Sequence, residues 1–299
     1  MQRRTALSTV VSTAIGIGWL PVSSLANPAA NGAAVQEQKP AQVTRQLRFS
    51  AVLSNPQGKR LVNQTLWMYL PITRTSAQDF IAVDTKIPYA MQTDAVGHSI
   101  IKIQIAELPP FAQRPFSLTV QTVQYSAPRP SDSGDQKDWL HTERFTEVSD
   151  SRVQAQARVL RASTPLQTAR NIYEWVANNI AYAGFIADDL GAVYALTERK
   201  GDCTEYAFLV VALARANQIP ARMVGGYVAD RDRAPRADEY HNWAELYVEG
   251  AWHLVDAQKK NWLSPCADYT AFRWYRGSAI NALGLAHRYA VDGDMNVRM

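Results

Sequence analysis

The chain has 299 residues, of which 47% are hydrophobic and 19% charged, and a formal net charge of +4. This length suits two domains at roughly 150 residues each, and the composition is that of a globular protein, not a disordered or fibrous one. The positive excess is small and the arginines are scattered, which argues against a nucleic-acid partner.

Residues 1–26 have the pattern of an export signal. The basic start MQRR precedes the apolar run ALSTVVSTAIGIGWL and the small residues that end at Ala26. The run is shorter than the roughly 20 residues of a permanent membrane helix. We therefore predict a cleaved signal peptide, a mature chain that starts near Asn27 without a membrane anchor, and a periplasmic or secreted location. Ala6 stands where a twin-arginine signal prefers an aromatic residue, so the general secretory route is favoured.

The segment after the signal is expected to be a flexible leader and then a β domain. Residues 27–44 are polar and alanine-rich, which predicts the leader. Between 45 and 127, apolar and polar residues alternate in several runs, as at Ile101, Ile103 and Ile105. This pattern predicts an antiparallel β-sandwich. It contains no cluster of titratable side chains, so we expect it to pack or to position a substrate.

A linker and a second, mixed domain follow. The Pro- and Ser-rich composition of 128–140 predicts the linker. A helix starts at Thr164-Pro165, with Thr164 as N-cap and Pro165 at the first helical position. Another helix spans 203–216, and three strand patterns come after it. Helices followed by antiparallel strands predict an α+β domain over 141–299, and an α+β fold class for the whole chain.

The sequence GDCTEYA places a cysteine at the start of a helix. Asp202 is the predicted N-cap and Glu205 completes a capping box, which puts Cys203 at the first helical position. Burial opposes ionisation of this thiol and the positive helix end favours it, and we expect the helix end to prevail. Two other readings stay open: inert packing, and a disulfide with Cys266, the one other cysteine.

A predicted hairpin supplies a histidine and a carboxylate. Glu249 and Gly250 suit a two-residue turn, and the resulting pairing puts His241 and Asp256 on one face of the sheet. Asp256 can then orient the imidazole so that it takes a proton from Cys203. A half-buried hairpin with a surface His–Asp pair fits the spacing equally well.

Three motifs in this order, GDCTEYAFLVVALARANQIPAR, VGGYV and HNWAELYVEGAWHLVDA, resemble the transglutaminase-like superfamily of bacterial secreted proteins. The lead-in segments IYEWVANNIAY and LGAVYALTERKGDC, and YLPIT and DAVGHSIIKIQI in the β domain, extend the resemblance over about residues 45–260. The resemblance implies a papain-like core in which Cys203 is the nucleophile, His241 the general base and Asp256 the orienting acid.

The resemblance also implies an activity. We expect a cysteine-dependent amidohydrolase or peptidase that forms a thioester with the amide of a peptide, a protein or a cell-wall stem peptide. Two alternatives are acyl transfer to an amine, as in protein crosslinking, and a non-catalytic binding protein of the same fold. The sequence names neither the substrate nor the oligomeric state.

The sequence also gives expectations about a cofactor and about the hydrogen-bond donors that would stabilise the oxyanion. Crosslinking relatives in animals use calcium, but this sequence has no acidic calcium-loop pattern, so we expect no cofactor and no metal. The backbone N–H of Cys203 is expected to be one oxyanion donor. The second donor stays open: Thr197 stands where papain has a glutamine, and Tyr194 is a candidate.

Overall fold

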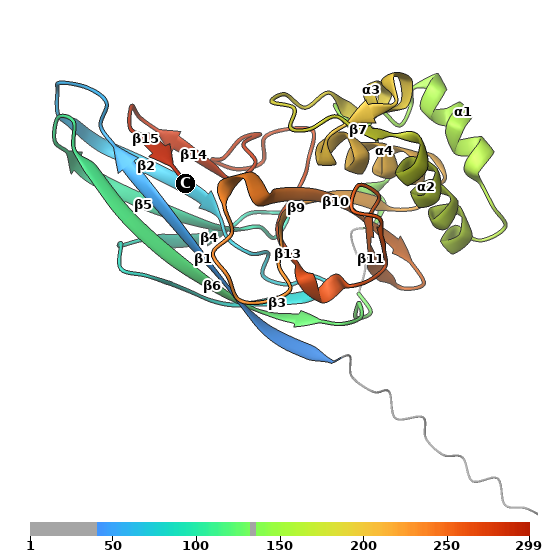
Figure 1. Cartoon of the computed structure of the whole chain (residues 1–299), viewed down its shortest axis with the longest axis horizontal. Coiled ribbons are helices and arrows are strands. Elements are labelled where there is room, and N and C mark those ends of the chain that lie inside the picture. Colours follow the sequence, from blue (N-terminus) through green and yellow to red (C-terminus); the bar gives the residue numbers. More distant parts are fainter. Residues whose placement is uncertain (1–40, 132–135) are drawn as a thin grey trace, which may run out of the picture. The chain divides into compact units, whose positions relative to one another are not determined.

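A computed structural model of the chain describes residues 41–131 and 136–299 (Figure 1). The predicted signal peptide, 1–26, and most of the predicted leader lie outside the described residues. Strand β1 (Gln42–Ser54) already contains residues 42–44, because they pair with the end of β6 (Gln113–Tyr125). The last three positions of the predicted leader are therefore strand.

The α+β fold class and the N-terminal sandwich are confirmed. Four antiparallel strands form one sheet in the order β15-β1-β6-β3, and four form a second sheet in the order β14-β2-β5-β4. Apolar residues alternate inward along β1 and β5, as the sequence pattern predicted. The remaining strands of the two sheets are β2 (Leu61–Tyr69), β3 (Gln78–Thr85), β4 (Ala90–Thr93), β5 (Ser99–Leu108), β14 (Tyr289–Asp292) and β15 (Asn296–Arg298).

The end of the chain returns to the sandwich. β14 pairs with β2, and β15 pairs with β1, so each covers what would otherwise be an open sheet edge. Residues 289–298, which the sequence analysis placed in the domain 141–299, thus belong to the sheets of the first domain. Residues 39–299 form one compact unit.

The second part of the chain is built around one buried helix. α4 (Cys203–Ala216) has every residue after Cys203 buried, as expected for a helix that is apolar on all sides. It packs on β10 (Tyr240–Val248) and β9 (Ala221–Val228), and three further helices contact it (Figure 1). They are α1 (Ser151–Leu160), α2 (Pro165–Asn179) and α3 (Gly191–Glu198).

The central sheet of this part is antiparallel, in the order β12-β11-β10-β9-β13. A separate pair, β7 and β8, is parallel and lies beside the start of α4. The strands not yet located are β7 (Ala181–Tyr182), β8 (Lys200–Gly201), β11 (Ala251–Asp256), β12 (Asn261–Trp262) and β13 (Tyr269–Trp274). Three short 3-10 helices are η1 (Gln136–Trp139), η2 (Ala237–Glu239) and η3 (Cys266–Asp268).

The predicted linker 128–140 carries a core residue. Trp139, at the end of η1, is 1% exposed and packs edge-on against Trp252 and Trp274. The guanidinium of Arg276 lies 3.6 Å from the centre of its ring. The segment has the composition of a linker, but its one tryptophan packs it against the central sheet.

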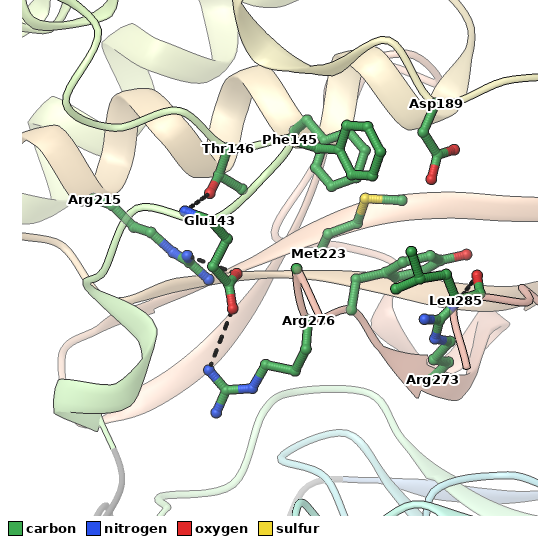
Figure 2. Close-up of a pocket in the computed structure, with 12 residues that line it drawn as sticks. Glu143, Phe145, Thr146, Asp189, Arg215, Met223, Arg273, Arg276 and Leu285 are labelled. Carbon is green, nitrogen blue, oxygen red and sulfur yellow. Dashed lines mark hydrogen bonds and ion pairs between the residues drawn. The ribbon is translucent and has the colours of Figure 1, made fainter. Parts of the chain in front are cut away.

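An ionic anchor lies just beyond this tryptophan. Glu143 pairs with Arg215 of α4 at 3.0 Å and with Arg276 at 3.7 Å, as Figure 2 shows. Arg215 is 1% exposed, and a buried charge of this kind is stable only when it is paired. The pocket that these residues line contains none of Cys203, His241 and Asp256, and its Arg215 joins α4 to the segment that contains Glu143.

Replacing Trp139 with alanine is expected to lower the free energy of unfolding by about 3–5 kcal/mol, because it opens a cavity in a packed aromatic cluster. The control is Val159→Ala, at a position on α1 that is 77% exposed. It should change the free energy of unfolding by less than about 0.5 kcal/mol. Urea unfolding of both variants measures the difference. Equal midpoints would show that Trp139 is not part of the folded core.

Candidate active site

The start of α4 has the predicted capping box. Oδ1 of Asp202 accepts from the backbone N–H of Thr204 at 2.7 Å, and Oε2 of Glu205 accepts from the N–H of Asp202 at 3.1 Å. Cys203 is therefore the first residue of the helix. A Cβ on Gly201 would lie 2.4 Å from Cβ of Glu205, so this turn requires glycine. Burial raises the pKa of Glu205 to about 7.

The hairpin has the predicted register. Glu249 and Gly250 form the turn with φ angles of 51° and 81°, and β10 pairs with β11 as expected, from Val248 opposite Ala251 onward. His241 and Asp256 consequently share a face. Nε2 of His241 lies 2.6 Å from Oδ2 of Asp256, and the two residues are only 6% and 1% exposed.

The contacts of Asp256 fix the imidazole. A carboxylate only accepts, so Nε2 of His241 carries the hydrogen and Nδ1 is left with a lone pair that can take a proton. Asp256 also accepts from the hydroxyl of Tyr269 at 2.8 Å and from the backbone N–H of Lys259 at 3.0 Å. The indole of Trp243 stacks on the imidazole and covers it. The carboxylate is thus held by three donors and cannot easily turn away.

The thiol lies against the chain next to His241. The backbone N–H of Asn242, the residue after His241, lowers the pKa of the Cys203 thiol. The pairing of β10 with β11 ends at Ala244 and Val255, so Asn242 lies beyond the end of that ladder. The start of α4 and strand β10 therefore lie close together, and Nδ2 of Asn242 donates to Oγ1 of Thr204 between them.

Two residues that the sequence analysis missed act on the thiol. The Thr204 side chain and the Asn242 backbone both lower the pKa of the Cys203 thiol, and Nδ2 of Asn242 donates to Oγ1 of Thr204 at 2.9 Å. Both residues are buried. Both groups favour the thiolate once it forms. Each of the two directly follows a predicted site residue, which is the one sequence signal that could have pointed to them.

The prediction that the helix end lowers the pKa of the Cys203 thiol is wrong. Burial, reinforced by the negative charge of Asp202, raises the pKa of the Cys203 thiol to about 12, although Asn242 and Thr204 act in the opposite direction. The helix end does not prevail because it is covered by protein and capped by a carboxylate. The resting thiol is therefore protonated at neutral pH, and a base must remove its proton during a reaction.

The remaining predictions about accessory residues are resolved in part. Cys203 and Cys266 are both free, and the thiol of Cys266 donates to the carbonyl of Tyr125 at 3.1 Å, so the proposed disulfide is not present. The hydroxyl of Thr197 donates to the carbonyl of Val193 in its own helix and is not free to act as an oxyanion donor.

The described residues lack two features, a metal-binding cluster and a membrane-spanning helix. No group of three or more His, Cys, Asp or Glu side chains is placed there to hold a metal ion. None of the helices in that part of the chain is both long and apolar enough to span a membrane.

Residues 153–257, which contain Cys203, His241 and Asp256, match the family model described as the transglutaminase-like superfamily. This part of the chain is therefore similar to that superfamily, as its motifs indicated. No curated protein matches the chain.

One solved structure supports the fold. A protein from Cytophaga hutchinsonii described as a "putative cysteine protease" is 18% identical, with 87% of this chain and 90% of that chain covered and a TM-score of 0.62. The periplasmic domain of TgpA from Pseudomonas aeruginosa is 16% identical, with 70% and 86% covered and a TM-score of 0.38. The first likeness extends through the sandwich as well as the transglutaminase-like core.

Replacing Thr204 with valine should slow alkylation of Cys203 about tenfold at fixed pH, because a hydrogen bond to the developing thiolate is lost. Thr204→Ser keeps the hydroxyl and should restore the rate. Thr197→Val is the matched control, since that hydroxyl bonds only to carbonyls of α3. Equal rates for Thr204→Val and the control would refute the contact with the sulfur; circular dichroism verifies folding.

The raised pKa predicts how the thiol titrates. In an acid whose pKa is raised, the neutral form persists to higher pH, so Cys203 should give no thiolate absorbance between about pH 6 and pH 9. The measurement is the ultraviolet absorbance difference between Cys266→Ala and the double variant Cys203→Ala/Cys266→Ala. A Cys203-dependent step in or below the range of roughly 3.5–7.5 seen for activated thiols would contradict this account.

Proposed function

We propose that this protein is a cysteine-dependent amidohydrolase or peptidase that uses Cys203, His241 and Asp256 on a peptide or protein amide, the stem peptides of the cell wall included. The observation that carries the proposal is the 2.6 Å contact between Nε2 of His241 and Oδ2 of Asp256, next to an Asn242 N–H that lowers the pKa of the Cys203 thiol. This arrangement leaves Nδ1 of the imidazole as the base for the thiol.

The chemistry follows from these positions. Nδ1 of His241 takes the proton of the Cys203 thiol as the sulfur attacks the amide carbonyl, and the negative charge moves to the carbonyl oxygen. The N–H of Cys203, in the first helical turn, has no carbonyl of the helix to bond to and stabilises that oxygen. When the C–N bond breaks, the imidazolium gives its proton to the leaving amine, and Asp256 stabilises the imidazolium throughout.

The second half of the reaction selects the acceptor. Water attacks the thioester on Cys203 and gives a proton to His241. The C–S bond then breaks, the carboxylic acid leaves, and the imidazolium returns the proton to the sulfur. Transfer to an amine instead requires a site that binds the amine or excludes water, because water is far more abundant. We therefore favour hydrolysis over protein crosslinking. A role as a binding protein of the same fold is the less favoured alternative, since the sequence retains Cys203, His241 and Asp256.

Export is part of the same proposal. The basic and apolar pattern of residues 1–26 supports a cleaved signal peptide, and hence a periplasmic or secreted enzyme without a membrane anchor. The amide bonds that such an enzyme would meet are those of cell-wall peptides and of exported proteins.

Incubating the protein with muropeptides and with a tryptic digest of bacterial proteins, in water labelled with heavy oxygen, should give new carboxyl termini that carry the label. Cys203→Ala, His241→Ala and Asp256→Asn should each reduce product by about a thousandfold or more, because the triad acts as a unit. Cys266→Ala is the control and should retain activity, because its thiol donates to a carbonyl of the sandwich. Mass spectrometry measures the products.

Adding a fluorescent primary amine to the same reaction distinguishes the acceptors. Carboxyl termini that carry heavy oxygen, without fluorescent products, support hydrolysis. Fluorescent products that form only when Cys203 is present show that the enzyme is an acyltransferase. Equal activity in wild type and Cys203→Ala would refute both reactions.

A further inference from the structure

Three large apolar side chains are exposed in one short stretch that runs from the end of β7 to the start of α3. Tyr182, Phe185 and Leu190 are 59%, 87% and 39% exposed. Single apolar side chains on a surface need no explanation, but a cluster that remains in water marks a place where something binds. We call these three residues the apolar rim.

The rim is fastened to the two residues that flank the nucleophile. Oδ2 of Asp202 accepts from the backbone N–H of Ile186 at 3.0 Å, and Oε1 of Glu205 accepts from the N–H of Leu190 at 3.0 Å. Each carboxylate of the capping box thus uses one oxygen for the helix and the other for the rim. The loop that presents Phe185 is therefore positioned by the same contacts that position Cys203.

The strand pairing sets an upper limit on the distance between the Cα atoms of Tyr182 and Cys203. Tyr182 pairs with Gly201 in the parallel strands β7 and β8, and paired strands lie about 4.8 Å apart. Gly201 is two residues before Cys203, which adds at most about 7 Å. The two Cα atoms are thus within about 12 Å. Burial raises the pKa of the Tyr182 hydroxyl, and Cys203 and Asp202 act in the same direction.

We propose that the apolar rim binds a bulky apolar side chain of the substrate, within two residues of the amide that Cys203 attacks. The inference rests on the proposed role of Cys203 as nucleophile. A substrate whose carbonyl carbon meets Sγ must lay its neighbouring residues beside this loop, since two residues span about 7 Å. Contact with Tyr182, Phe185 and Leu190 removes apolar surface from water only when the substrate side chain is itself apolar. Substrates with aromatic or large aliphatic residues beside the attacked bond are therefore preferred.

Two thiol reagents with the same reactive group test this inference without a known substrate. They are iodoacetamide and its N-(2-phenylethyl) derivative, applied to the full chain with Cys266→Ala, and the rate of modification of Cys203 is followed by mass spectrometry. The selectivity is the ratio of the phenylethyl rate to the iodoacetamide rate, divided by the same ratio for free cysteine. It should exceed one and fall about tenfold in Phe185→Ser, as expected for loss of an aromatic contact.

Phe111→Ser is the matched control, because Phe111 is 70% exposed but lies in the turn between β5 and β6 of the sandwich. It should keep the wild-type selectivity, whereas Tyr182→Ser should lower it. A selectivity of one in the wild type, or an equal loss in Phe185→Ser and Phe111→Ser, overturns the rim and leaves the nucleophile intact. If neither reagent modifies Cys203, the proposed function fails and the rim fails with it.

Discussion

The hydrogen bond between His241 and Asp256 is the interaction on which the site depends, and it is set by the register of one hairpin. Both turn residues, Glu249 and Gly250, have positive φ, which makes the connection between β10 and β11 two residues long. A shift of one residue would carry Asp256 to the other face of the sheet. The imidazole would then lose its buried acceptor, and Nδ1 would no longer be fixed as the free nitrogen.

The second constraint is the buried start of α4. It gives Cys203 a precise place, but it also keeps the thiol neutral, because burial and Asp202 both disfavour the thiolate. The hydroxyl of Thr204 and the N–H of Asn242 offset part of this effect at the sulfur itself. The site is therefore arranged for removal of the proton during the reaction, and this makes the orientation of His241 more important than the helix end.

Local features were predictable from the sequence, and long-range ones were not. The capping box at Asp202 and Glu205, the N-cap at Thr164 and the hairpin register each depend on residues close together in the chain. Tyr269 reaches Asp256 from a different strand, and its spacing matches no motif. The return of residues 289–298 to the sandwich and the burial of Trp139 are likewise decided by packing between distant segments. The predicted direction of the pKa shift of Cys203 is wrong because this direction depends on how deeply the end of the helix is buried.

The most direct measurement is a double-mutant cycle on the alkylation rate of Cys203, in a Cys266→Ala background, with Asp256→Asn and His241→Ala. If Asp256 acts through the imidazole, each single change slows the reaction, and the double variant reacts no more slowly than His241→Ala alone. If the two effects multiply, or if neither change alters the rate, then the His241–Asp256 pair does not serve the thiol, and the account is contradicted.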